Sequence, residues 1–336
     1  MGLAHASSHG AEHPNQRRPG SDVQSYNGTS HPQYGEIALL FNERAHLNQR
    51  TPDRIALSRI RREAPETQAD LDTTLASFAQ HNIGTIIIDG GDGTLRDVLS
   101  LAARHFTERM PRIAIIPSGK TNALAHDIGI GTRWTARDLP STLCEWDVVQ
   151  RAPLEIRYGD DSEARLRGFM FGTGAFVRAT SLAQSVHRGG AFQGLGVGLA
   201  LAGAIGQTLF GAETSAWRRG EAVTLDLDGQ AIHREFYILL ASTLERLPLG
   251  LRPFGRVRSG LKLLGVDAPP RKVLLAAAAV LAGSERQWLS EAGCKRADTD
   301  SFRLCIDGGF VLDGEVFPGG ELTISRGAPI EFLVPA

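Results

Sequence analysis

The first part of the folded sequence alternates short apolar runs with segments of helical periodicity. Ile37–Phe41, Thr85–Ile88 and Arg112–Ile116 are compact apolar runs bounded by turn residues, the pattern of buried parallel strands. After the second run, apolar residues recur at the spacing of one helix face: Leu95, Val98, Leu99, Ala102, Ala103 and Phe106. Strand, turn and helix repeated in this order predict a doubly wound α/β domain.

Three further helices are expected in the same part of the chain. Mixed polar and apolar periodicity predicts them around Pro52–Arg61, around Asp70–His81 and near Asn122–Asp127. The turn Asp89–Gly93 precedes the amphipathic helix, and we expect Thr94 to cap that helix.

After about Leu143 the pattern changes to short alternating segments. We predict strands at residues 154–156, 165–171, 223–227, 232–240, 261–266, 302–306, 310–312, 322–325 and 330–334, with two helical stretches between them. Asp228-Gly229 separates two of these strands and is a strong hairpin signal. This part therefore predicts an antiparallel β-sandwich-like domain with helical insertions.

These patterns divide the chain into three parts. Residues 1–33 are rich in His, Ser, Gly, Asn and Pro and have few aliphatic side chains, so we expect a disordered tail. An α/β domain is predicted over residues 34–143. A β-rich domain is predicted over residues 144–336, and its last strand could return toward the first domain. The tail histidines His5, His9, His13 and His31 are irregularly spaced and no cysteine accompanies them, so metal binding is not favoured.

Composition excludes some classes of protein. The 36 Lys and Arg nearly cancel the 37 Asp and Glu, so no overall charge favours nucleic acid. Three cysteines without metal-ligand spacing fit a reducing compartment. Residues 189–212 carry no charge for 24 residues, enough to cross a bilayer, but eight glycines favour buried, broken helices instead. We therefore expect a soluble, cytoplasmic protein.

The most informative segment is Asp89-Gly90-Gly91-Asp92-Gly93-Thr94, between a predicted strand and a predicted helix. Glycines let the backbone approach an anion closely, and the N-terminus of the helix offers free N–H groups and a positive dipole. Asp92 does not suit direct contact with phosphate, which suggests that it acts through a cation or a positioned hydroxyl. A tight turn that merely needs glycines and a capping Thr is the alternative interpretation.

A second polar turn, Pro117-Ser118-Gly119-Lys120-Thr121-Asn122, follows the next predicted strand. Gly119-Lys120-Thr121 resembles the end of a P-loop, but that motif requires glycine where Ala114 stands. A Walker A site is therefore not predicted. Two polar turns at the carboxyl ends of neighbouring parallel strands instead predict a nucleotide-binding crevice.

Three motifs in order resemble the diacylglycerol kinase catalytic-domain family. They are Gly-Gly-Asp-Gly-Thr at residues 90–94, Pro-x-Gly-x-x-Asn-x-x-Ala from Pro117, and Leu312-Asp313-Gly314-Glu315. That family includes bacterial diacylglycerol and lipid kinases, sphingosine kinases and ceramide kinases, and the resemblance covers roughly residues 37–335. It implies that residues 34–143 form a nucleotide-binding domain and residues 144–336 a lipid-substrate domain, with ATP and Mg²⁺ between them. The activity it implies is transfer of a phosphoryl group to a lipid hydroxyl.

The resemblance also implies roles for individual residues. Glu315 would be the general base that accepts the proton of the lipid hydroxyl, with Asp92 as the second catalytic residue. The nucleotide-binding residues implied are Gly90, Gly91, Asp92, Gly93, Thr94, Asp97, Gly119, Lys120, Asn122 and, in a loose alignment, Thr67.

The chain departs from the family pattern at three places. Lys120 stands where the family commonly has Thr, and the early Asn-Pro motif is reduced to Asn42 followed by Glu43. Some bacterial members hold a structural Mg²⁺ with an Asp-Gly pair in the β domain. The matching pair here is Ser259-Gly260, so we expect that metal to be absent.

A basic cluster is interleaved with apolar residues in the second half of the chain. Arg246, Arg252, Arg256, Arg258 and Lys262 alternate with Leu247, Leu249, Leu251 and Phe254. Such a segment could adsorb to an anionic membrane surface, which would place the protein peripherally at the inner membrane face. A solvated loop is the alternative interpretation of the same pattern.

Two other functions are compatible with the first motif. An NAD kinase shares it, but the Thr-Pro-Thr-Gly-Ser-Thr-Ala-Tyr type of segment of those enzymes is not found in this sequence. A pseudokinase that binds lipid or nucleotide without transferring phosphate would tolerate Lys120 and Ser259. The presence of Asp92 and Glu315 argues against it, because a binding module needs no positioned base.

Overall fold

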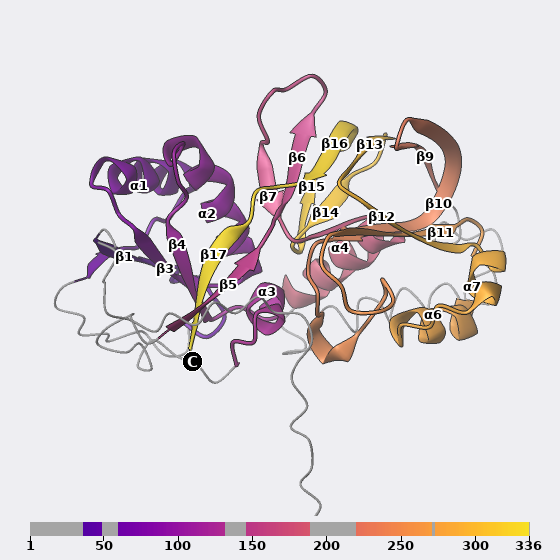
Figure 1. Cartoon of the computed structure of the whole chain (residues 1–336), viewed down its shortest axis with the longest axis horizontal. Helices are drawn as coiled ribbons and strands as arrows, with labels where there is room; N and C mark the ends of the chain where they lie inside the picture. Colours follow the sequence, from indigo (N-terminus) through magenta and orange to yellow (C-terminus); the bar gives the residue numbers. More distant parts are fainter. Residues whose placement is uncertain (1–35, 49–59, 132–145, 189–219, 271–272, 336) are drawn as a thin grey trace, which may run out of the picture.

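The chain folds around two β-sheets that lie side by side (Figure 1). The computed structural model describes residues 36–48, 60–131, 146–188, 220–270 and 273–335. The predicted tail, the uncharged segment 189–212 and most of the helix predicted around Pro52–Arg61 lie outside these residues. Arg61 itself begins a short strand instead of ending a helix.

The first sheet has six strands in the order β2-β1-β3-β4-β17-β5. Its strands are β1 (Ile37–Phe41), β2 (Arg61–Glu63), β3 (Thr85–Gly90), β4 (Arg112–Pro117), β5 (Trp146–Arg151) and β17 (Ile330–Pro335). All pairs are parallel except that of β17 with β5. The predicted buried strands β1, β3 and β4 are thereby confirmed, whereas β2 and β5 were missed.

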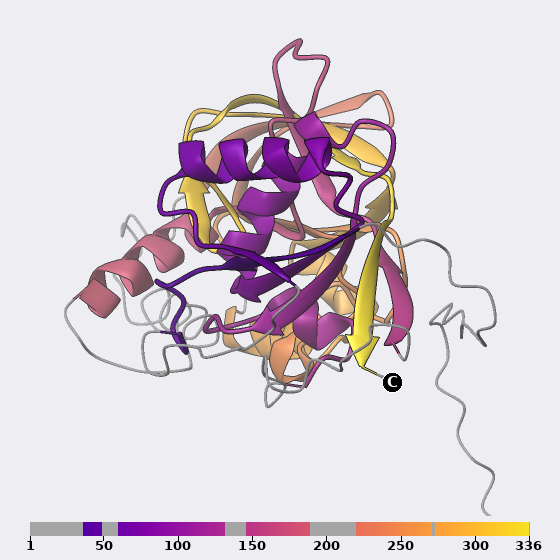
Figure 2. The same ribbon diagram turned by 90° about the vertical axis from the view of Figure 1, so that its left-hand side faces the viewer.

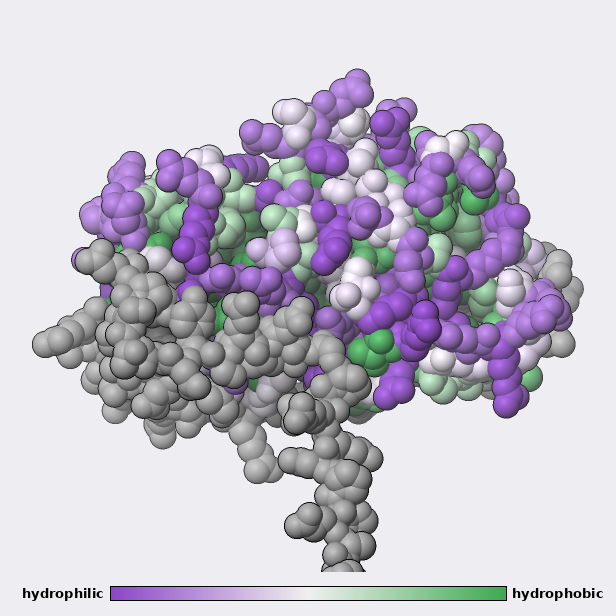
Figure 3. All heavy atoms as spheres, viewed as in Figure 1, coloured by the Kyte–Doolittle hydropathy of each residue, from purple (hydrophilic) through white to green (hydrophobic). Residues whose placement is uncertain are grey.

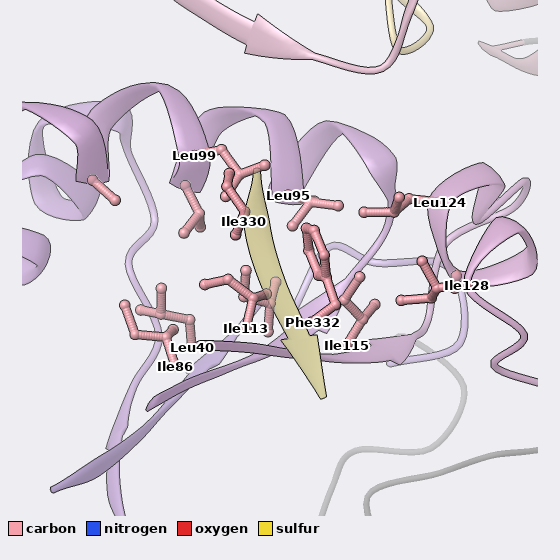
Figure 4. Packing of buried hydrophobic residues seen from close by; sticks show 14 of the residues in the cluster. Leu40, Ile86, Leu95, Leu99, Ile113, Ile115, Leu124, Ile128, Ile330 and Phe332 are labelled. Atoms are coloured by element: carbon pink, nitrogen blue, oxygen red, sulfur yellow. The ribbon is translucent and has the colours of Figure 1, made fainter. Parts of the chain in front are cut away.

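Three helices pack on one face of this sheet. They are α1 (Gln68–Gln80), α2 (Asp92–His105) and α3 (Ala123–Asp127), close to their predicted positions. Leu95 and Leu99 of α2 cover Ile113, Ile115 and Phe332 of the sheet (Figure 4), and Figure 2 shows α1 lying across the top of the same layer. Each such fully buried side chain contributes about 1.5–3 kcal/mol, so this apolar layer holds α2 firmly on the sheet.

The second sheet is antiparallel and curls upon itself. Its main strand order is β15-β14-β8-β10-β9-β13-β16-β6-β7. Outside this order, β11 pairs with β10 and with β12. The strands are β6 (Leu154–Tyr158), β7 (Leu166–Gly168), β8 (Met170–Gly174), β9 (Glu221–Leu227), β10 (Gln230–Ser242), β11 (Leu261–Asp267), β12 (Cys294–Thr299), β13 (Ser301–Ile306), β14 (Phe310–Leu312), β15 (Glu315–Phe317) and β16 (Gly320–Arg326). A parallel-sheet α/β domain followed by a curled antiparallel domain is the fold class that the sequence predicts.

Local details of the second sheet agree with the sequence in part. Asp228 and Gly229 have φ angles of 54° and 79°, the left-handed pair that a two-residue hairpin requires. The segment predicted as one strand over residues 165–171 is divided between β7 and β8. The polar strand β12 was not predicted, because few apolar residues mark its alternation. The strand β15, Glu-Val-Phe, was not predicted because three residues are too few to show an alternation.

Helices of the second domain are α4 (Ala175–Arg188), α6 (Val273–Leu281) and α7 (Gln287–Glu291), and the short 3₁₀ turn η3 spans Pro248–Gly250. Among the residues described, no helix is both long enough and apolar enough to cross a bilayer.

The two sheets meet along helix α2. Arg167 in β7 donates its backbone N–H to the hydroxyl of Ser100 over 2.8 Å, and this hydroxyl donates to the carbonyl of Arg96 over 2.7 Å. The domain limits at residues 143 and 144 stay a prediction. Strand pairing places both β5 and the last strand, β17, in the first sheet.

Candidate functional site

Three turns come together at the carboxyl edge of the first sheet. Because β1, β3 and β4 are neighbouring parallel strands, the residues that follow them lie beside one another. The N–H of Asn42 donates to the carbonyl of Asp89, and the N–H of Ser118 donates to the carbonyl of Gly90, both over 3.0 Å. The buried carboxylate of Asp89 accepts from the Ser118 hydroxyl and, over 2.9 Å, from Asn48. Asp89 therefore links the three turns by hydrogen bonds.

The two glycine turns touch each other directly. A Cβ on Gly119 would lie 2.5 Å from the Cα of Gly91 and 2.7 Å from Oδ1 of Asn122. Asn122 adopts a left-handed backbone (φ 50°), and its side-chain amide bonds the backbone of the turn that precedes it. It accepts from the N–H of Gly119 and donates to the carbonyls of Pro117 and Gly119, over 3.0–3.1 Å. Glycine is thus required at 119 by close approach, and the amide of Asn122 holds the turn.

Helix α2 begins earlier than the sequence predicts. Strand β3 continues through Gly90, and the N-cap residue of α2 is Gly91. Because glycine has no side chain, the N-cap residue provides no capping oxygen to the helix. The prediction that Thr94 caps the helix is therefore wrong: Thr94 lies inside the first turn and accepts from the Nδ2 of Asn42 over 2.7 Å. No capping side chain covers the first turn of α2, which suits an anion.

A cavity of about 400 Å³ opens beside these turns. Thr67, Thr94 and Asp97 line it together with Asn42 and Gln68. Thr67 is also the cap of α1, where its hydroxyl and the carboxylate of Asp70 form a reciprocal capping box. The structure therefore brings Thr67 to the cavity but commits its hydroxyl to α1, so a ligand would share that hydroxyl with the helix.

The third motif comes to the site from the second sheet. Asp313 and Gly314 form the tight turn between β14 and β15, with φ angles of 48° and 84°. The carboxylate of Asp313 accepts from the backbone N–H groups of Phe169 and Met170 over 2.9–3.1 Å. These bonds fix the turn to the start of β8, and the exposed side chain of Glu315 follows two residues later.

Arg96 joins the first and third motifs. Its guanidinium is almost fully buried and donates to Asp97 over 2.7 Å and to the carbonyl of Leu312 over 3.3 Å. Its Nη1 lies 3.8 Å from Oε2 of Glu315, and it stacks 5.2 Å from the ring centre of Phe317. A single side chain of α2 thus positions the hairpin that carries the predicted general base.

Asp92 and Asp313 interact electrostatically. Burial and, second, the charge of Asp92 raise the pKa of Asp313 to about 7, whereas the backbone N–H groups of Phe169 and Met170 oppose the shift. Burial also raises the pKa of Asp92, against hydrogen bonds from backbone N–H groups of Asn122, Ala123 and Leu124. Two carboxylates that disfavour each other's charge fit a divalent cation, and Mg²⁺ in proteins commonly takes one or two carboxylates plus substrate phosphates.

The remaining predicted residues lie at the edge of this arrangement. Lys120 is exposed on the second turn, and Gly93 lies in the first turn of α2. In the β domain, the carbonyl of Gly260, next to Ser259, accepts from the buried ammonium of Lys262 over 3.0 Å. Among the described residues, no cluster of three or more His, Cys, Asp or Glu could hold a metal ion.

Sequence reasoning missed three residues of the site. The sequence marks Asn42 only as the remnant of a motif and Asp313 only as a member of the third motif without a role of its own, and it does not mark Arg96 at all. Arg96 follows Thr94 by two positions in a helix, where a charged residue ordinarily faces solvent. Only the approach of the second sheet buries it.

Comparison with known proteins agrees with this description. Residues 42–150 match the sequence model of the diacylglycerol kinase catalytic domain. The matched region begins just after β1, spans both glycine turns and reaches into β5. The matched family is the one that the three motifs resemble. The comparison with curated proteins found no significant match.

Solved structures from Bacillus anthracis str. Sterne share the fold. A protein provisionally described as a diacylglycerol kinase aligns with a TM-score of 0.63 at 15% identity, over 91% of this chain and 98% of its own. A structure described as a diacylglycerol kinase aligns with a TM-score of 0.59 at 15% identity, over 89% and 97% of the two chains. The two-domain arrangement is therefore that of a diacylglycerol kinase-like fold.

Proposed function

We propose that this protein is an ATP-dependent lipid kinase that phosphorylates a hydroxyl of diacylglycerol or a related lipid. The observation that carries the proposal is the meeting of the two glycine turns with the Asp313–Glu315 hairpin through Arg96. It joins an anion-binding helix terminus to a carboxylate from the other domain. A kinase needs both, because it must hold a polyphosphate and activate an alcohol.

In this proposal the first turn of α2 and the Gly119 turn bind the phosphates of ATP. The nucleoside occupies the cavity lined by Thr67, Thr94 and Asp97. Mg²⁺ bound with the nucleotide would be held by Asp92 and Asp313 and would neutralise charge on the phosphoryl oxygens.

Glu315 accepts the proton of the lipid hydroxyl as its oxygen attacks the γ-phosphorus. The bond between that phosphorus and the bridging oxygen of ADP breaks in the same step, and ADP leaves. Arg96 lies beside Glu315 and holds the hairpin in place without contacting the reacting atoms.

The test is transfer of label from Mg²⁺-ATP to a panel of lipids in mixed micelles, with diacylglycerol, a sphingoid base and ceramide. We expect one lipid class to be labelled, and Glu315→Gln to lower the rate by about 10²–10⁴-fold, the usual contribution of a general base. Glu321→Gln, an exposed carboxylate on β16, is the matched control and should leave the rate unchanged.

Labelling that survives Glu315→Gln at full rate would remove Glu315 as the base. ATP binding without labelling of any lipid would favour the pseudokinase. Phosphorylation of NAD in the absence of lipid would favour the NAD kinase.

A further inference from the structure

The loop that precedes β11 has an unusual charge balance. Residues 246–266 contain four arginines and one lysine and no acidic residue. The structure separates these cations into two groups. Lys262 is 2% exposed and donates to the carbonyls of Arg258 and Gly260, and Arg258 pairs with Asp298 over 2.6 Å. These two cations serve the fold, whereas Arg252 and Arg256 have exposed side chains.

The same loop exposes large apolar side chains. Leu249 is 72% exposed and Val257 is 44% exposed. Leu249 has a left-handed backbone (φ 60°) between Pro248 and Gly250, a conformation that costs a residue with a side chain about 1–2 kcal/mol. A leucine side chain that is exposed at the tip of a turn contributes no hydrophobic stabilisation to the fold. Transfer of such a side chain to an apolar phase would gain about 1.5–3 kcal/mol.

Helix α6 extends this surface. The N–H of Arg252 donates to the carbonyl of Leu281 over 2.8 Å, and the N–H of Arg256 donates to Glu285 over 3.0 Å. Arg296 bonds the carbonyls of Pro253 and Ser284, both over 2.7 Å, and so locks the loop to the end of α6. On α6, Leu275 is 63% exposed. Loop and helix lie on the side of the second sheet away from β13 and β16 (Figure 1).

We propose that Leu249, Arg252, Arg256, Val257 and Leu275 form a docking patch for an anionic lipid bilayer. Separate apolar side chains that project among cations suit a deformable interface, where they enter the acyl region while arginines contact headgroup phosphates. Of the acidic neighbours, Glu285 accepts from the backbone N–H of Arg256, and Asp298 pairs with Arg258. Figure 3 shows hydrophobic atoms at the surface over this loop, bordered by hydrophilic residues.

The patch deepens the proposed function, because a kinase that acts on a lipid must reach the bilayer that contains it. Binding to vesicles can nevertheless be measured without ATP or turnover. The two proposals can therefore fail separately.

The experiment is co-sedimentation of the full chain with vesicles of phosphatidylcholine alone or mixed with phosphatidylglycerol. We expect binding to the mixed vesicles, and a loss of about tenfold or more in Arg252→Glu/Arg256→Glu, since each cation contributes about 1 kcal/mol at an anionic surface. Leu249→Ser should weaken binding several-fold. Arg303→Glu/Arg326→Glu carries the same charge change on exposed positions of β13 and β16 and is the control, with Leu47→Ser for the apolar change.

The proposal is wrong if the wild-type chain binds neither kind of vesicle. It is also wrong if the control double variant at Arg303 and Arg326 loses as much binding as the double variant at Arg252 and Arg256. Concentration-dependent self-association that Leu249→Ser abolishes, without vesicle binding, would assign the surface to a second copy and overturn the proposal. Thermal melting of each variant checks that it is folded. If the patch variants lose vesicle binding but phosphorylate lipid in neutral micelles at the wild-type rate, docking and catalysis are separate, as the structure implies.

Discussion

The buried guanidinium of Arg96 donates to the carbonyl oxygen of Leu312 over 3.3 Å, across 216 positions of sequence. Leu312 is the last residue of β14, immediately before the Asp313 turn. This bond links the helix that follows the first glycine turn to the hairpin that carries Glu315. The relative placement of the two halves of the candidate site therefore depends on Arg96, together with the bond from Arg167 to Ser100 that joins β7 to α2.

Arg96→Met should lower phosphoryl transfer while leaving the apolar stem of the side chain in place. Hydrogen bonds to charged groups contribute about 1.5–3 kcal/mol, so a loss of roughly tenfold to a hundredfold in kcat is expected. The KM for ATP should rise less than kcat falls, because Arg96 does not line the cavity and acts on it only through Asp97, which accepts from the guanidinium. Arg104→Met, on the exposed last turn of α2, is the control. An equal loss in both variants would show that the bond to Leu312 is irrelevant.

Gly119→Ala should separate the two glycine turns. The added Cβ would lie 2.5 Å from the Cα of Gly91, which is backbone and cannot rotate away. Overpacking of this kind typically costs about 1–3 kcal/mol, and we expect both ATP affinity and the free energy of unfolding to fall. Calorimetric titration with ATP and urea denaturation measure the two effects. Gly131→Ala, where a Cβ meets nothing within 4 Å, should be neutral in both.

Asp313→Asn tests the paired carboxylates. The pKa of Asp313 is raised from its ordinary value of 3.8 to about 7, so between these values the folded state keeps a proton that the unfolded state releases. The stability that this proton gives is present at low pH and is lost as the pH rises through about 7. Asparagine does not titrate. The free energy of unfolding of the wild type minus that of Asp313→Asn should therefore fall as the pH rises from about 4 to about 7. Urea denaturation at several pH values measures it.

Asp307→Asn, on the exposed turn between β13 and β14, is the control. A wild-type minus Asp313→Asn difference that stays flat with pH would contradict the raised pKa of Asp313. Added Mg²⁺ should reduce the loss near neutral pH, because a bound cation stabilises both ionised carboxylates.

Lys262→Met tests the buried ammonium beneath the loop. Burial lowers the pKa of Lys262 from 10.5 to about 8, against the attraction of Asp127. Between these values the unfolded state binds more protons, so the wild type should gain stability as the pH rises from about 8 toward 10.5. The wild-type minus variant difference should therefore rise over this range, opposite in sign to the trend for Asp313. Lys295→Met, at an exposed position of β12, is the control.

Much of the fold can be predicted from the sequence, because the patterns that specify these strands, helices and turns are local. The apolar run Thr85–Ile88, the helix face from Leu95 to Phe106 and the Asp228-Gly229 turn each depend on neighbouring residues. Strands such as β12, Cys294–Thr299, were missed because their stability comes from pairing with a partner that is distant in sequence. The membership of β17 in the first sheet likewise depends on pairing with β4 at more than two hundred positions' distance.

Three short motifs at characteristic positions were enough to predict the class of the protein, because they carry most of the chemistry. Gly91, Asp92 and Asn122 could be chosen from type and spacing alone. Only the tertiary structure decided that Asn42 bonds Thr94, that Asp313 lies near Asp92, and that Arg96 is buried between two domains. The physical reason is that burial and charge interaction depend on distances in space. Spacing along the chain sets those distances only within a turn or a single element.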